Sequence, residues 1–165
     1  MKKTHIILFV FIVFSLGASG QQYNQAIGIR GGYSSGFEYR VYTGDINSYK
    51  LLLSTRSRGL QLTGFKEFHQ YGFFGFPEQL DFFFGLGLHA GYERWDVYHY
   101  SRGIRWREPR TELIAGLDGL CGVEYTFYEF PVSLGFEVKP FFDVWGQQAF
   151  YVRLFDFAFT LKYLF

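Results

Sequence analysis

The sequence predicts an all-β fold, an eight-stranded antiparallel up-and-down transmembrane β-barrel. Three observations support this. Aromatic residues make up 23% of the 165 residues and charged residues only 19%, a balance too apolar for a disordered chain. After residue 20 no apolar run approaches the ~20 residues that a membrane-spanning helix needs. Apolar and polar residues instead alternate with the period of two that a β-strand requires.

The first 20 residues have the order of a secretory signal peptide. Lys2 and Lys3 precede an apolar run over 6–14, and small residues follow up to Gly20. We expect cleavage before Gln21, which leaves one barrel domain over 21–165. The alternative is a membrane anchor, but nine apolar residues form a helix of only ~14 Å, about half of a hydrocarbon core.

Alternation predicts eight strands in the mature chain. It is clearest over 155–165, where Phe155, Phe157 and Phe159 share one face with later apolar residues and Asp156 lies on the other. The predicted strands cover 27–33, 37–41, 49–56, a segment beginning at residue 60, 80–93, 113–125, 132–139 and 155–165. Turn-forming residues separate them at 34–36, 43–48, 58–59, 75–78, around 102–103, at 129–131 and over 140–148. The fourth strand contains a conflict, because Lys66 falls on its apolar face unless a bulge near Gly64 shifts the register.

The two faces of the strands differ in side-chain size, which indicates their direction. The charged face is rich in glycine, and small residues suit the narrow interior of an eight-stranded barrel. The bulky apolar face would then contact lipid, whereas a soluble lipid carrier, the alternative, would place it inside. The predicted lumen residues are Arg30, Glu38, Arg40, Lys50, Arg56, Asp81, Glu93, Asp118, Glu124, Glu137, Lys139, Asp156 and Lys162. Their charges nearly cancel, which favours a lumen plugged by salt bridges over a narrow solute channel.

The signal sequence, the eight alternating strands, the polar lumen and the ending Leu161–Phe165 together resemble the small outer-membrane β-barrels of Gram-negative bacteria, of the OmpX and OmpA-barrel kind. The segments 59–64 and 116–122 look similar to small barrels of the Bacteroidota. The resemblance implies outer-membrane localisation, a monomer, and recognition of the terminal Phe165 by the barrel-assembly machinery. It implies no catalytic motif, and functions within this class are diverse.

With both termini in the periplasm, the segment 93–110 would face outward. It interleaves arginines with aromatic residues, a combination suited to lipopolysaccharide phosphates or an acidic glycan. The candidate anion-binding patch comprises Arg94, Trp95, Arg102, Arg105, Trp106 and Arg107. The alternative is an aromatic belt with a projecting hairpin that needs no ligand.

No constellation of residues predicts an enzyme, a cofactor or a metal site. His99, near Ser101 and Asp96, is the one place for a lipid-modifying site, and this remains an alternative. His89 is expected in the lumen and Cys121 on the lipid-facing side. A formal charge of +1 argues against a nucleic-acid partner. We therefore expect a non-enzymatic barrel that acts in envelope integrity or surface interaction through its outward loops.

Overall fold

A computed structural model describes residues 23–56, 58–72, 79–101, 104–146 and 150–165. The predicted signal peptide and Arg102 lie outside these residues. The strands are β1 (Gln25–Gly32), β2 (Gly36–Tyr42), β3 (Asn47–Arg56), β4 (Gly59–Tyr71), β5 (Leu80–Ser101), β6 (Ile104–Thr126), β7 (Val132–Val138), β8 (Phe141–Trp145), β9 (Tyr151–Arg153) and β10 (Phe157–Leu164). Within the described part of the chain, no helix is long and apolar enough to cross a membrane.

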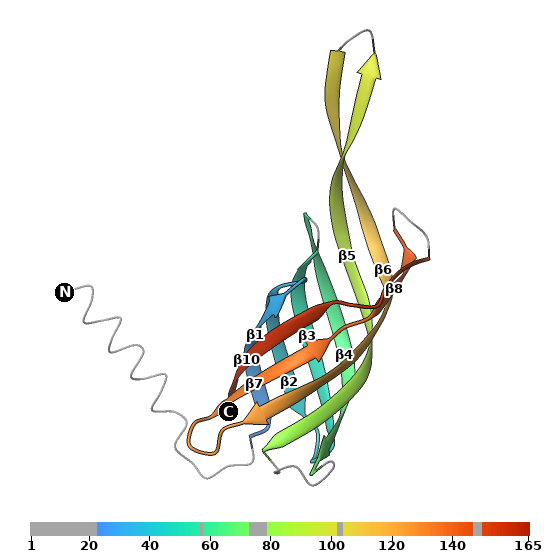
Figure 1. The fold of residues 1–165 in the computed structure, drawn as a ribbon. Coiled ribbons are helices and arrows are strands. Elements are labelled where there is room, and N and C mark those ends of the chain that lie inside the picture. Colours follow the sequence, from blue (N-terminus) through green and yellow to red (C-terminus); the bar gives the residue numbers. More distant parts are fainter. Residues whose placement is uncertain (1–22, 57, 73–78, 102–103, 147–149) are drawn as a thin grey trace, which may run out of the picture.

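The strands form a closed antiparallel ring with eight positions (Figure 1). Consecutive strands from β1 to β6 are neighbours, and β1 pairs with β10 to close the ring. β7 and β8 pair with consecutive parts of β6, so together they fill one position of the ring. β9 pairs with β8 and β10 pairs with β7, so these two strands fill the next position. The predicted eight-stranded antiparallel barrel is therefore confirmed. We call the end where Gln25 pairs with Phe165 the terminal end, and the opposite end the hairpin end.

The seventh position differs from the sequence prediction. The segment 140–148 is expected to be a connection, but Phe141–Trp145 forms strand β8 and pairs with β6. Pro140 interrupts the ladder because proline has no N–H to donate. Its carbonyl still accepts a hydrogen bond from the Gly119 N–H at 2.8 Å, so the chain remains beside β6.

The fourth strand contains no bulge. β4 pairs with both β3 and β5 in an unbroken register, so the alternation continues to the end of the strand. Phe65, Glu67 and His69 consequently face the interior, whereas Lys66 is exposed on the outer surface. The conflict noted in the sequence is resolved by an outward-facing lysine.

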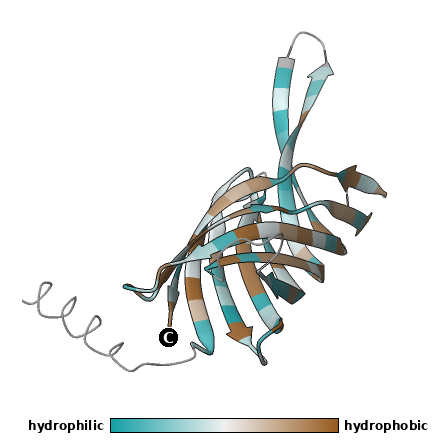
Figure 2. Cartoon of the chain, turned by 60° about the horizontal axis from the view of Figure 1, so that its bottom comes forward, coloured by the Kyte–Doolittle hydropathy of each residue, from teal (hydrophilic) through white to brown (hydrophobic). Residues whose placement is uncertain are grey.

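The barrel has its apolar residues outside and its charges inside. Leu86 and Phe159 on the outer surface are 75% and 71% exposed, while Arg40 and Lys162 inside are 1% exposed. Figure 2 shows hydrophobic and hydrophilic positions alternating along the strands. This polarity is the reverse of a soluble barrel and matches that of a transmembrane one. The interior also holds one apolar cluster of Leu52, Phe65, Phe83 and Leu120.

β5 and β6 are far longer than the other strands. They have 22 and 23 residues and remain paired as far as Ser101 and Ile104. Their outer halves form a two-stranded ribbon that rises beyond the hairpin end (Figure 1). Nine residues of strand correspond to about 30 Å. The segment 93–110, for which the sequence left open an anion-binding connection or a projecting hairpin, is therefore mostly a β-hairpin.

Candidate functional site

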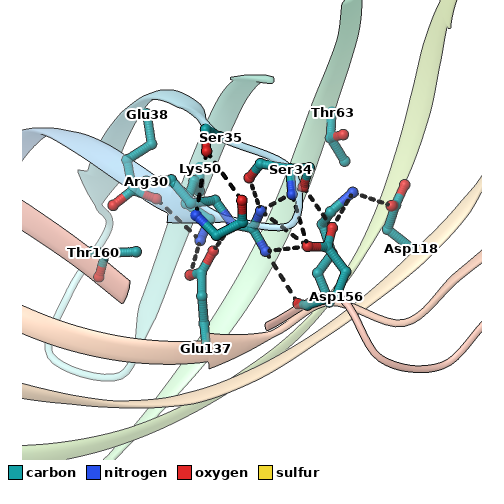
Figure 3. A network of polar contacts seen from close by, with 12 residues as sticks. Arg30, Ser34, Ser35, Glu38, Lys50, Thr63, Asp118, Glu137, Asp156 and Thr160 are labelled. Atoms are coloured by element: carbon teal, nitrogen blue, oxygen red, sulfur yellow. Dashed lines mark hydrogen bonds and ion pairs between the residues drawn. The ribbon is translucent and has the colours of Figure 1, made fainter. Parts of the chain in front are cut away.

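Charged side chains contact one another in the interior of the barrel. Figure 3 shows a first group of them, around Arg30 of β1. Arg30 lies 2.5 Å from Glu137 through its Nε and 3.3 Å from the Asp156 carboxylate. The Ser34 hydroxyl donates to Asp156 at 2.5 Å. Lys50 approaches Glu137 from the other side, with 2.8 Å between Nζ and Oε2. Each anion of this group thus has a cation as a direct partner.

A second group lies toward the terminal end and shares Lys50 with the first. Arg40 contacts Glu67 at 2.7 Å and Glu124 at 2.8 Å. Lys162 is 2.5 Å from Glu124 and 3.3 Å from Glu38. Lys50 is 3.3 Å from Glu38 and 3.2 Å from Glu67. The six groups, three cations and three carboxylates, form a closed cycle of alternating charge, an arrangement that offsets the cost of removing each charge from water.

A third group continues from Asp156 to the hairpin end. Lys139 bridges Asp156 and Asp118 at 3.5 and 3.3 Å. The two ring nitrogens of His89 face Asp118 at 2.6 Å and Asp143 at 2.9 Å. Carboxylates therefore lie on both sides of this ring. Arg56 contacts Asp143 and completes the chain of ion pairs.

The interior holds cations and carboxylates in similar numbers. Among the described residues, the buried cations are Arg30, Arg40, Lys50, Arg56, Lys139 and Lys162, and the buried carboxylates are Glu38, Glu67, Asp81, Asp118, Glu124, Glu137, Asp143 and Asp156. Six arginines and lysines therefore face eight carboxylates, and two histidines, His69 and His89, lie among them.

Aromatic rings fill the space between the ion pairs. The Phe83 ring centre lies 5.0 Å from the Arg40 guanidinium carbon and 5.6 Å from the Lys162 Nζ. Arg56 stacks over Phe141 at 4.2 Å. Such cation–aromatic contacts are stabilising when they are desolvated. A Cβ added at Gly122 would lie 2.6 Å from the Phe83 ring, so a glycine there makes room for the phenylalanine.

Most of the lumen prediction is confirmed. Every predicted lumen residue is buried except Glu93, which is half-buried and lies 2.5 Å from the Arg56 Nε. His89 is in the interior and Cys121 is exposed on the outer surface, as expected. Sequence reasoning missed Glu67, because Lys66 disturbed the pattern of its strand, and Asp143, which falls in the segment predicted as a connection. Gln61 and Thr63 lie on the inward face of β4, and counting every second residue onward from them would have identified Glu67 and His69.

Ser48, His69 and Asp81 form an array that the sequence did not reveal. The Ser48 Oγ lies 2.8 Å from the His69 Nε2, and the Nδ1 of the same ring contacts the Asp81 carboxylate. The order of atoms is that of a Ser–His–Asp hydrolase. However, Ser48 is fully buried, and its Oγ is also 2.8 Å from the Glu67 Oε2. A hydroxyl has one proton, and donating it to Glu67 leaves Ser48 to accept from His69. We therefore assign this array to the ionic interior.

The hairpin has two chemically different faces. Residues directly opposite each other in the register lie on the same face. One face, the cationic face, consists of Arg94, Asp96, Tyr98, Tyr100, Arg105, Arg107, Pro109 and Thr111. The other, the acidic face, consists of Glu93, Trp95, Val97, His99, Trp106, Glu108, Arg110 and Glu112. The strand alternation thus separates three arginines with one aspartate from three glutamates with one arginine.

The structure divides the predicted anion-binding patch between these faces. Arg94, Arg105 and Arg107 belong to the cationic face, and Trp95 and Trp106 belong to the acidic face. The aromatic partners of the arginines are tyrosines instead. The Arg105 guanidinium carbon is 4.3 Å from the Tyr98 ring centre and 5.5 Å from that of Tyr100. A pattern of alternating residues cannot show this separation without the register of the hairpin.

Ion pairs fix the base of the hairpin. Asp96 accepts from Arg107 at 2.6 Å and contacts Arg58 of the neighbouring β3–β4 connection. The hydrogen bond from Arg107, which has the largest effect, and that from Arg58 hold the pKa of Asp96 below its usual range. On the acidic face, His99 lies 2.9 Å from Glu108 and stacks on Trp106. The hydrogen bond from His99 and the charge of Arg110 lower the pKa of Glu108.

His99 does not meet the partners that a catalytic site would need. Its predicted partner Asp96 lies on the opposite face of the hairpin and contacts arginines. The side chain of Ser101 is not among the described ones. In the described part of the chain, no three His, Cys, Asp or Glu side chains are grouped as a metal site.

Sequence comparisons find no relatives of this chain. No protein-family model matches it, and no curated protein does.

Solved structures resemble it in fold alone. The chain is similar to the N-terminal β-barrel domain of Pseudomonas aeruginosa OprF, with a TM-score of 0.53 and 13% identity over 88% of this chain and 100% of that one. Neisserial surface protein A (NspA) aligns with a TM-score of 0.46 and 11% identity, covering 86% of this chain and 93% of its own. The fold is therefore that of an eight-stranded β-barrel found in OprF.

Proposed function

We propose that this protein is an integral outer-membrane β-barrel with a closed lumen, whose projecting hairpin binds lipopolysaccharide. The reversed polarity of the barrel supports insertion into a membrane, because only lipid can solvate an outer surface of exposed Leu, Phe and Tyr side chains. The terminal end would lie at the periplasmic side and the hairpin end outside the cell. This orientation places the short turns in the periplasm and the long hairpin at the surface, as is usual for such barrels.

Direct ion pairs across the interior support a closed lumen. Lys50 contacts carboxylates on three other strands, Glu38 of β2, Glu67 of β4 and Glu137 of β7. Phe83 and Leu52 lie at the same level within the apolar cluster. A passing ion would have to break several of these pairs at once. The protein should therefore show no steady conductance in planar lipid bilayers, and stable unitary currents from the wild-type protein would contradict a closed lumen.

The separation of charge on the hairpin supports lipopolysaccharide as its ligand. The cationic face continues the outward, lipid-facing side of β5 and β6, where Tyr92 and Leu113 lie opposite each other. The ribbon twists as it rises (Figure 1). In the proposed orientation, its first residues would lie next to the lipid headgroups. Arginine guanidinium groups bind phosphate oxygens through paired hydrogen bonds. Tyr98 and Tyr100 both contact the Arg105 guanidinium group and so restrict its position.

Two charge-removing variants on the same hairpin test this proposal. The double variant R105Q/R107Q removes two cations of the cationic face, while R110Q removes the cation of the acidic face. In detergent solution we expect R105Q/R107Q to bind purified lipopolysaccharide about tenfold more weakly, which corresponds to ~1.4 kcal/mol, and R110Q to bind it like the wild type. Equal weakening by both variants would show that only net charge matters. Unchanged binding by R105Q/R107Q would refute the assignment of this face.

A further inference from the structure

Lys66 is an exception on the outer surface of the barrel. Among the described strand residues, the outward positions between the terminal end and Tyr92 are apolar, aromatic, small or uncharged except at Lys66. Lys66 is exposed, and within the described residues it forms no ion pair with a carboxylate. A cation on the lipid-facing side is destabilising in proportion to its depth in the membrane. Its presence therefore calls for an anionic partner outside the chain.

An apolar groove begins beside this lysine. It has a volume of about 470 Å³. Its walls include Tyr39, Tyr49, Leu86 and Leu88, and Gly64 forms part of its floor. A Cβ at Gly64 would have no atom within 4 Å, so the missing side chain leaves the groove open. The shape and lining suit an acyl chain.

The lysine points toward the terminal end. Its Nζ lies 5.3 Å from the ring centre of Phe68, which is two residues farther along β4 in that direction. Long basic side chains reach from lipid-facing positions toward the headgroup layer in this way. The amino group therefore lies on the side of the groove that is nearer to the terminal end.

We propose that Lys66 and this groove bind one phospholipid of the inner leaflet, with the lipid phosphate on Nζ and an acyl chain along Gly64. The proposal rests on the orientation proposed above, which places the terminal end in the periplasm. The occupant follows from charge and position together, because the site offers one cation for a phosphate and an apolar wall for a chain. Lipopolysaccharide occupies the opposite leaflet and would meet the hairpin end instead.

Native mass spectrometry of the full mature protein in a neutral detergent tests the phosphate contact. The probes are dioleoylphosphatidylglycerol and dioleoylglycerol, which have the same chains but differ in the phosphate headgroup. We expect the wild type to retain the phospholipid at least tenfold more than dioleoylglycerol, K66Q to lose this preference, and K66R to keep it. An unchanged preference in K66Q would overturn the proposal.

A variant that fills the groove tests the acyl-chain contact, and a third probe, lipid A, tests which lipid occupies the site. Gly64→Leu fills the groove and should lower retention of both probes severalfold, whereas Ala115→Leu, at an outward position of another groove, should leave it unchanged. Loss of retention in both variants, or in neither, would overturn the acyl-chain part. Retention of lipid A in preference to dioleoylphosphatidylglycerol by the wild type, lost in K66Q, would overturn the assignment of a phospholipid as the occupant. If the wild type discriminates between none of these probes, the Lys66 site is refuted while barrel insertion is unaffected.

Discussion

Single residues of the interior are held by partners on distant strands, so removing one charge leaves others unpaired. Glu124 shows this clearly, because it contacts Arg40 and Lys162 and accepts from the Ser133 hydroxyl at 2.5 Å. Burying an ion pair is not itself strongly stabilising, but breaking one is costly. The value of the network is therefore best measured by disrupting it at one point.

We expect Glu124→Gln to lower the free energy of unfolding by about 3 kcal/mol, since two buried cations lose a shared anion. Urea titration of the protein folded into phospholipid vesicles measures this change. Glu108→Gln is the matched control, because its carboxylate is exposed on the hairpin and should not shift the unfolding midpoint. Equal shifts in the two variants would contradict a stabilising role for the interior network.

Close packing at the interior glycines gives a second prediction. A Cβ at Gly135 would lie 2.5 Å from the Oγ1 of Thr160, its partner in the β7–β10 register. Gly135→Ala should therefore destabilise the barrel by about 1–3 kcal/mol through overpacking. Adding Thr160→Ala should recover much of this loss in the same urea titration, although the Thr160 hydroxyl also receives a hydrogen bond from Lys162.

The control for this pair is Gly64→Ala, which adds the same methyl group where no atom lies within 4 Å. Its unfolding midpoint should match that of the wild type. If the effects of Gly135→Ala and Thr160→Ala simply add, the two positions do not interact and the packing argument fails.

At the residue scale, the alternation of residue types predicted direction well. It placed Arg30, Lys50 and Glu137 inside correctly, because period two assigns every residue of a strand once one is known. Residue type alone would place Phe65 and Phe83 outside, whereas the period of their strands places them inside, where Gly87 and Gly122 lie opposite them. Lys66 shows the same limit of residue type. It is charged but faces outward, as the period of its strand requires.

At the scale of elements, the strands that cross the barrel were predicted directly, whereas the hairpin beyond it was expected only as an alternative. Both faces of the outer halves of β5 and β6 mix charged with aromatic residues, so no hydrophobic period marks them. Pairing holds them together instead, with Tyr98 and Arg107 opposite each other on one face and His99 and Trp106 on the other. β8 was missed for a different reason, because Pro140 gives the signal of a turn where the pairing with β6 is only interrupted.

The ion pairs of the hairpin make its order dependent on pH. Hydrogen bonds lower the pKa of Asp96 and of Glu108. A carboxyl with a lowered pKa stabilises the folded form above its ordinary pKa of about 4, and this contribution is lost as the pH falls through the lowered value. In a Trp145→Phe variant, we expect the fluorescence anisotropy of Trp95 and Trp106 to stay constant from pH 7 to 5 and to fall below pH 4.

Two controls accompany this measurement. Circular dichroism should show that the β-structure of the barrel persists over the same range. A D96N/E108Q variant, also lacking Trp145, should show no such transition because neither group can titrate. A transition above pH 5, or one that survives in D96N/E108Q, would mean that other groups order the hairpin.

At the scale of the whole molecule, a single rule of polarity connects the interior, the outer surface and the hairpin. Along β5, the inward positions carry Asp81 and His89 in the barrel and continue into Glu93 on the acidic face. The outward positions carry Leu86 and Leu88 in the barrel and continue into Arg94 on the cationic face. The change from leucine to arginine on the same side of one strand marks where the solvent would change from acyl chains to phosphate and water.

This change of solvent predicts which positions a membrane-impermeant maleimide can reach in intact Gram-negative cells. Cys121, exposed on the lipid-facing side, is first replaced by alanine so that only introduced cysteines react. Tyr100→Cys on the hairpin should be labelled in intact cells, because Tyr100 is 72% exposed beyond the hairpin end. Phe130→Cys, in the turn between β6 and β7 at the terminal end, should be labelled only after the outer membrane is disrupted, although Phe130 is 61% exposed. The opposite pattern would reverse the orientation, and labelling of both positions in intact cells would contradict a barrel that spans the membrane.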